Sequence, residues 1–151
     1  MYLSNKGSVA VHCLVFISEY GERMRVTSEL LATSTGCNAV TIRGIVSALK
    51  KNGILRVKDG AGGAVLNCPP EQITLWRVYQ AVEPDGLEKL IGVHGAPSPY
   101  CPVGRSIHAV LEAAYAPVRA DLRASLEKIT LGGILADYHS RQPASAPAQT
   151  E

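Results

Sequence analysis

Residues 41–66, TIRGIVSALKKNGILRVKDGAGGAVL, decide the fold class. Apolar residues recur at helical spacing as far as Gly53, which predicts an amphipathic helix that ends at this glycine. The strand ILRVK, the turn DGAGG and the returning strand AVLN follow, and they predict a β-hairpin. The residues predicted to face the core from the helix are Ile42, Ile45, Val46 and Leu49.

Two further helices are predicted before this stretch. The first begins at Ser4 as its N-cap and ends at Tyr20, before a glycine. The second begins after Thr27, whose hydroxyl can cap it, and ends at Gly36. Asn38 then caps the helix described above. Three helices and a hairpin within about sixty residues are typical of a winged helix-turn-helix.

The second half of the chain is predicted to hold one more helix of this domain, a connector rich in proline and glycine, and a long helix. An apolar stripe follows the long helix over residues 106–127, which would be about 33 Å long. Pro117 is expected to interrupt and kink it. Its length and stripe favour a partner in a second subunit. The stripe, which is the predicted dimer interface, consists of Ile107, Leu111, Ala114, Val118, Leu122 and Leu126.

The chain is therefore expected to be mainly α with a small β-hairpin. A short closing helix, capped by Thr130, is predicted to follow the long one. The expected parts are a winged helix-turn-helix domain (1–83), a connector (84–104), dimerisation helices (105–138) and a disordered tail (139–151).

The distribution of charge indicates an anionic partner for the first half of the chain. Residues 1–66 carry eight Lys and Arg against four Asp and Glu, a net charge of +4, whereas residues 67–151 carry seven against nine, a net of −2. The sequence contains neither a signal-peptide pattern nor an apolar run long enough to span a membrane. Its four cysteines form no CxxC pair, so the cytoplasm is the expected compartment.

The polar face of the third helix suits DNA, because small residues permit close approach and cations reach phosphates or base edges. The alternative is a solvated helix face, and for Arg43 alone a phosphate contact or an ion pair. Arg43 lies in the first turns, where a guanidinium could bond a guanine. Hydroxyls and backbone N–H groups at the start of the second helix could bind phosphate, and the glycine-rich turn could lie in a minor groove. The predicted contacts are Thr27, Ser28, Val40, Arg43, Ser47, Lys51, Arg56, Lys58 and Gly62.

Cys101 is the thiol that the sequence singles out. It precedes Pro102, a residue favoured at the start of a helix, and Arg105 and His108 follow closely. A helix N-terminus and nearby cations favour the thiolate, which makes Cys101 a candidate redox sensor. The alternatives are an unreactive cysteine and a small thiol enzyme that uses Cys101 with His108, for which the sequence supplies no orienting carboxylate.

The segments YLSNKGSVAVHCLVFIS, VTSELLATSTGCNAVTIRGIVSALKKNGIL and KDGAGGAVL closely resemble the Rrf-two family of bacterial winged-helix transcription regulators. IscR, NsrR and CymR belong to this family, and the second half of the chain is most similar to its YwnA-like branch. The resemblance implies a dimer whose long helices cross between subunits. It also implies that the recognition helix presents Asn38, Val40, Thr41 and Arg43 to DNA.

The chain departs from the family pattern in two ways. Asp59 stands where many relatives have an arginine just before the wing glycines, and Lys58 is the expected substitute. Members that bind an iron–sulfur cluster use three closely spaced cysteines in the connector, where this chain has only Cys101. A cluster of that type is therefore not expected, although a different site using His12 or His94 stays open.

Together these observations predict a homodimeric DNA-binding regulator, a repressor that binds a palindromic operator and responds to thiol oxidation. The chain is not expected to be an enzyme or to need a cofactor. Its expected partners are double-stranded DNA and a second copy of itself, and no membrane. A winged helix used only for protein contacts is the remaining alternative.

Overall fold

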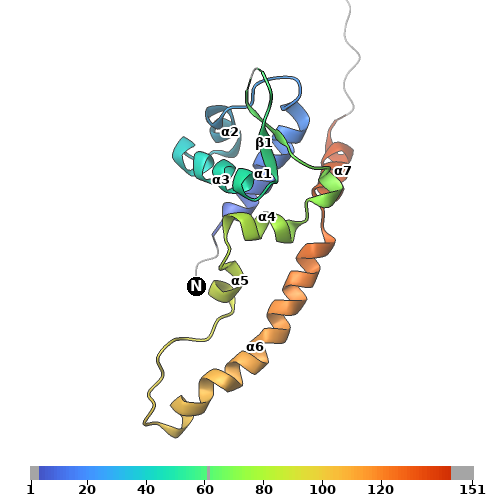
Figure 1. The fold of residues 1–151 in the computed structure, drawn as a ribbon. Helices are drawn as coiled ribbons and strands as arrows, with labels where there is room; N and C mark the ends of the chain where they lie inside the picture. Colours follow the sequence, from blue (N-terminus) through green and yellow to red (C-terminus); the bar gives the residue numbers. More distant parts are fainter. Residues whose placement is uncertain (1–3, 61, 144–151) are drawn as a thin grey trace, which may run out of the picture.

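The chain folds into a helical body from which one long helix extends (Figure 1). The computed structural model describes residues 4–60 and 62–143. The elements of the body's first part are α1 (Lys6–Tyr20), α2 (Ser28–Thr35), α3 (Ala39–Lys51), β1 (Leu55–Val57) and β2 (Ala64–Leu66). They are followed by a 3-10 turn (Pro70–Gln72), α4 (Leu75–Val82), α5 (Gly86–Leu90), α6 (Pro102–Lys128) and α7 (Leu131–Arg141).

One buried core joins α1, α2, α3, the hairpin, α4 and α7. The four residues that the sequence assigned to the inner face of α3 are all buried in it, which confirms that prediction. The core also includes Leu131 and Leu135 of α7. The closing helix α7 therefore packs on the winged helix-turn-helix, in which α3 is the predicted recognition helix, although the sequence grouped α7 with the dimerisation helix.

The first helix begins one residue later than predicted. Asn5 occupies the N-cap position, while the Ser4 hydroxyl accepts a hydrogen bond of 3.1 Å from the Lys6 N–H. The helix ends at Gly21, as expected. A Cβ at Gly21 would lie 2.9 Å from the carbonyl oxygen of Ala64, so a glycine here lets β2 approach α1.

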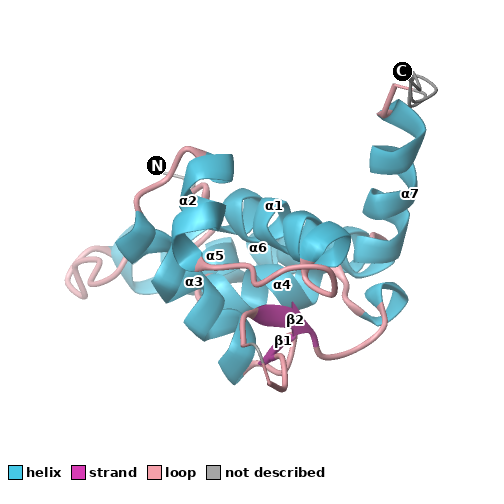
Figure 2. Ribbon diagram, turned by 90° about the horizontal axis from the view of Figure 1, so that it is seen from above, coloured by secondary structure: helices cyan, strands magenta, loops and turns pink. Residues whose placement is uncertain are grey.

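The hairpin is antiparallel and pairs Leu55 with Leu66 and Val57 with Ala64. The Lys58 N–H donates to the Gly63 carbonyl at 2.8 Å, which closes the wing beyond the two strands. Gly60, Gly62 and Gly63 have positive φ angles between 73° and 89°, which explains the glycine-rich turn. Figure 2 shows the hairpin at the edge of the body, where β1 contacts α3 and β2 contacts α1.

The long helix begins earlier and is more regular than the sequence indicated. α6 has 27 residues, so it is about 40 Å long. It continues through Pro117 without the predicted interruption, because the loss of one backbone hydrogen bond does not end a helix with several turns on either side. None of its residues is buried in the single chain, and its N-terminal half lies away from the body (Figure 1).

Both ends of the connector region differ from the expectation. The short helix α5 forms within it, and α6 already begins at Pro102. At the other end of the chain α7 extends to Arg141, so the first residues of the predicted tail are helical. Residues 144–151 of that tail lie outside the described residues.

A short β-bridge ties the end of α6 to the body. Thr74 pairs with Thr130, and the flanking N–H groups of Leu75 and Leu131 donate to Ile129 at 2.8 Å and to Ile73 at 2.7 Å. The two threonines also cap α4 and α7 through their hydroxyls. Within residues 4–60 and 62–143, no helix has the length and apolar character needed to cross a bilayer.

Leu131→Ala tests whether α7 belongs to the winged-helix core. Leu131 is 2% exposed, so truncation leaves a cavity and should lower the free energy of unfolding by about 2–5 kcal/mol in denaturant titrations. Val40→Ala, at a side chain that is 71% exposed, is the control and should change it by less than about 0.5 kcal/mol. Equal effects of the two substitutions would show that α7 is not part of this core.

Candidate nucleic-acid interface

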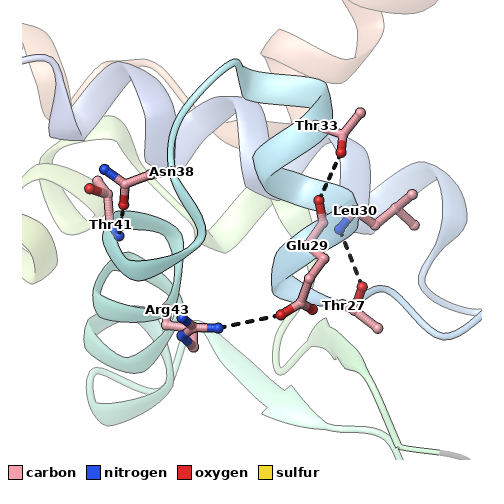
Figure 3. A network of polar contacts seen from close by, with 7 residues as sticks. All are labelled: Thr27, Glu29, Leu30, Thr33, Asn38, Thr41 and Arg43. Carbon is pink, nitrogen blue, oxygen red and sulfur yellow. Dashed lines mark hydrogen bonds and ion pairs between the residues drawn. The ribbon is translucent and has the colours of Figure 1, made fainter.

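Two capped helix starts define the helix-turn-helix (Figure 3). The Thr27 hydroxyl accepts a hydrogen bond of 3.2 Å from the Leu30 N–H at the start of α2. The Asn38 side-chain oxygen accepts one of 2.8 Å from the Thr41 N–H at the start of α3. Between them Gly36 takes a left-handed conformation with φ 73°. The caps confirm the predicted helix starts, and they occupy two oxygens that the sequence also assigned to DNA contacts.

The outer face of α3 is exposed to solvent. Val40, Arg43, Ser47 and Lys51, which the sequence placed on this face, are all exposed. Between them Gly44 has no atom within 4 Å of the position that a Cβ would take. A glycine inside a helix costs about 0.5–1 kcal/mol relative to alanine, and no contact within the chain requires one here. An outer face of this kind lets another surface approach the helix backbone closely.

Arg43 forms an ion pair that the sequence left as an alternative. Its guanidinium donates to a carboxylate oxygen of Glu29 in α2 at 3.3 Å (Figure 3). The two side chains are 55% and 70% exposed, so the pair contributes at most about 1 kcal/mol. A phosphate or a guanine could therefore displace Glu29 at small cost.

A groove of about 430 Å³ lies between the start of α2, α3 and the hairpin. Three cations, Arg25, Arg43 and Lys50, line it together with a single carboxylate, Glu29. Among the predicted contacts, Thr27, Ser28, Arg43 and Gly62 also line this groove. The structure thus brings the start of α2, the recognition helix and the wing together around one basic depression.

Arg25 is the functional candidate that sequence reasoning missed. Its Nε lies 3.8 Å from the position that a Cβ would take at Gly62, and its Cγ lies 3.1 Å from the position that a Cβ would take at Gly63. The available signal was local: Arg25 stands two residues before the Thr27 cap, and a chain entering a helix next to a wing can reach that wing. In space it occupies the place beside the wing glycines that was expected for Lys58.

Lys58 points elsewhere. Its ammonium group donates to the main-chain carbonyls of Glu22 at 2.7 Å and Gly21 at 3.4 Å. Lys58 therefore fastens the wing to the end of α1, and its proposed DNA contact would require these bonds to break. Arg56, in the middle of β1, is exposed and pairs with Val65 in the hairpin.

The remaining predicted contacts lie on other parts of α3. Val40 and Thr41 border a second depression of about 280 Å³, on the far edge of the helix, together with Lys6 and Val82. Ser47 and Lys51 lie on the open face and line neither depression. The predicted residues therefore surround the exposed half of α3 rather than converge on one point.

The C-terminal end of α3 is anchored from two directions. Gly53 has φ 70°, and the N–H groups of Gly53 and Ile54 donate to Lys50 at 3.1 Å and Leu49 at 3.0 Å, which is a Schellman motif. The Gly53 carbonyl accepts from Arg77 of α4 at 3.2 Å and from Asn67 at 3.1 Å. The position of the recognition helix thus depends on both α4 and the wing.

The cysteines are scattered. Cys101 is exposed at the N-cap position of α6, where the sequence placed it, but among the described residues no hydrogen bond joins it to His108. Cys13 is buried in the core, and burial, together with the nearby Cys37, raises its pKa to about 11, so its thiol stays protonated at neutral pH. Cys37 is half-buried against the same core, and Cys68 is half-buried beside Arg77, which donates to its sulfur at 3.3 Å.

These positions do not fit an iron–sulfur cluster within one subunit, because the connector supplies a single thiol. Residues 4–60 and 62–143 contain no group of three His, Cys, Asp or Glu side chains placed to hold a metal ion.

Comparison with known proteins supplies the family. The family model described as "Rrf2: Iron-dependent Transcriptional regulator" matches residues 3–137. The Bacillus subtilis (strain 168) protein YwnA, whose name assigns it to the HTH-type transcriptional regulators, is 34% identical over 133 residues, which are 88% of this chain and 96% of YwnA. These matches confirm the resemblance to the Rrf-two family and to its YwnA-like branch.

Solved structures agree on the fold. A crystal structure described as that of a DNA binding protein aligns with a TM-score of 0.70 and 31% identity, and covers 86% of this chain and 98% of its own. The structure of IscR from T. potens aligns with a TM-score of 0.69 and 19% identity over 97% of this chain and 94% of its own, which supports the fold alone. The matching family and YwnA are described as regulators and not as enzymes, as the sequence predicted.

Proposed function

Because the chain belongs to the Rrf2 family of transcriptional regulators, we propose that it is a homodimeric DNA-binding repressor of a palindromic operator. The observation that carries the proposal is the bare outer face of α3, where an exposed glycine without neighbours lies beside the basic groove. A helix with this face fits the major groove of DNA.

The groove beside α3 supplies the phosphate contacts in this proposal. Arg25, Arg43 and Lys50 line it, and such cations release counterions when they neutralise phosphates. Arg43 exchanges Glu29 for a base edge or a phosphate when DNA binds. The wing, with Arg25 beside Gly62 and Gly63, lies against the DNA backbone next to the bound major groove.

The free face of α6 supports dimerisation. Val103, Val110 and Val118 are 66%, 59% and 46% exposed, and apolar side chains at this density on one helix favour burial against a partner. Ile107, Leu111 and Ala114 continue the same face. In contrast, Leu122 and Leu126 line a cavity within the subunit, so the proposed interface uses the N-terminal part of the predicted stripe.

A two-fold dimer of this kind places two copies of α3 in successive major grooves, about 34 Å apart. The palindromic operator follows from that symmetry, since each half-site meets the same surface.

Cys101 is the proposed thiol sensor. Its thiol is exposed at the start of α6, in reach of peroxide. Hydrogen peroxide would oxidise the sulfur to a sulfenic acid with release of water. The added oxygen changes the N-cap residue of the long helix through which the two subunits are joined.

Arg43→Ala tests the reading of DNA. Titration of DNA from upstream of the protein's own gene should give saturable binding, and the substitution should weaken it about 5- to 150-fold, because a bidentate arginine–guanine contact contributes about 1–3 kcal/mol. Glu29→Gln is the matched control: it removes the partner of Arg43 and should leave affinity equal or higher. Equal weakening by both substitutions would mean that the ion pair, not DNA contact, matters.

Gly44→Leu separates stability from binding in the same titration. The variant should be more stable to denaturant by about 1 kcal/mol, yet lose affinity because the added side chain holds DNA away from α3. A dependence on salt concentration is expected for the wild type. A DNA affinity that does not change with salt concentration would favour a winged helix used for protein contacts. The absence of a preferred sequence after selection from random DNA would favour the same alternative.

Leu111→Asp tests the dimer interface. The charge on the apolar face of α6 should convert the dimer to a monomer in sedimentation experiments at micromolar concentration. Ala120→Asp, at an exposed position on the opposite face, is the control and should remain dimeric. A monomeric wild type would contradict the proposed assembly.

Peroxide treatment tests Cys101. Operator affinity of the wild type should change at least fivefold after oxidation, and that of Cys101→Ser should not change. Mass spectrometry must show that Cys101 is modified. A modified Cys101 with unchanged affinity would exclude the sensor.

A further inference from the structure

A cavity of about 250 Å³ lies between α4, α5 and α6. Its walls are mainly apolar: Trp76 and Tyr79 come from α4, Leu87 and Leu90 from α5, and Leu122 and Leu126 from α6. We propose that this cavity binds a small uncharged aromatic molecule, and that its occupation changes operator affinity. The second half of the proposal rests on the proposed function, whereas the first half does not.

The aromatic walls are held from outside the cavity. The Arg123 guanidinium lies 4.9 Å from the centre of the Trp76 ring and donates to Glu127 at 2.9 Å. Gly7 of α1 packs directly on the Tyr79 ring, since a Cβ at this position would lie 2.4 Å from ring carbons. Both rings therefore have fixed positions as walls.

The wall formed by α5 is also supported. Arg119 of α6 donates to the Ile91 carbonyl, just after α5, at 2.8 Å and pairs with Glu112. This bond ties the end of α5 to the long helix. The cavity is thus a feature of three connected helices and not a gap between independent parts.

The size of the cavity selects the ligand. A cavity of about 150 Å³ lined by Leu, Ile and Phe accepts benzene, and sites for drug-sized compounds begin near 300 Å³. A volume of about 250 Å³ lies between these limits and suits one ring or two fused rings.

The charges around the cavity select an uncharged ligand. Glu83 and Lys89 are the charged residues of its lining, and their signs cancel. Aromatic and leucine walls would desolvate an ionised group without providing a matched counterion. The polar groups of Gln80 and Ser4 are available to a hydroxyl or an N–H on the ligand.

The position of the cavity connects it to the recognition helix. Trp76 is adjacent in sequence to Arg77, whose guanidinium holds the Gly53 carbonyl at the end of α3 at 3.2 Å. A ligand that binds one arrangement of α4 and α6 more tightly than another shifts the population toward that arrangement. In a dimer joined through α6, such a shift changes the spacing of the two copies of α3.

The test uses Trp76, which is the only tryptophan in the chain. Its indole N–H gives a single signal in nitrogen–proton NMR spectra of the full chain without DNA. Addition of 2-naphthol should move this signal in a saturable way, and 2-naphthoate, an anion of the same ring size, should bind at least tenfold more weakly. Leu87→Phe and Leu90→Phe, which fill the cavity, should each weaken binding of 2-naphthol at least tenfold. Leu75→Phe is the matched control on α4 outside the lining and should bind like the wild type.

Three results would overturn the binding site: no saturable shift, an equal affinity in the filled variants, or a shift only in Leu111→Asp monomers. The last would assign the cavity to side chains of the partner subunit. Operator affinity is then measured with and without saturating 2-naphthol, and a change of at least fivefold is expected. Unchanged affinity would overturn the regulatory half. Failure to bind DNA at all would remove the proposed function as well, while the indole signal would still decide the binding site.

Discussion

The carbonyl oxygen of Gly53 is the point on which the relative arrangement of α3, the wing and α4 depends. It lies at the end of α3 and accepts hydrogen bonds from Arg77 of α4 and from Asn67 beyond the wing. The left-handed conformation of Gly53 turns the chain from the helix into β1, and a residue with a Cβ would be strained there. The helix α3, the wing and α4 therefore have one common anchor.

The cations of the first half have three different structural roles. Lys58 fastens the wing to the end of α1, and Arg43 faces Glu29 across the helix-turn-helix. Arg25 and Lys50 line the groove between α3 and the wing. A net charge alone treats all of these residues as equal. The groove is basic because its cations outnumber the single carboxylate within it, and not because every lysine and arginine faces outward.

Local chemistry was sufficient to predict the elements of the winged helix-turn-helix. Thr27, Asn38 and Gly36 start and stop helices through bonds to neighbours within four residues, and such bonds form in almost any context. The inner face of α3 follows from the period of its apolar residues. Ser4 shows the limit of this reasoning, because two adjacent polar residues can both serve as a helix start: the helix begins after Asn5, although the Ser4 hydroxyl is the one that bonds a main-chain N–H there.

The fold class, the caps, the glycine-rich wing and the apolar stripe of α6 could be predicted from the sequence, since each depends on contacts between residues close along the chain. Packing between distant parts of the chain instead makes α7 complete the winged-helix core and turns Leu122 and Leu126 toward α4 and α5. It also puts Arg25, rather than Lys58, beside the wing glycines. These outcomes depend on side chains many residues apart, and periodicity says which face of a helix is apolar but not which neighbour covers it.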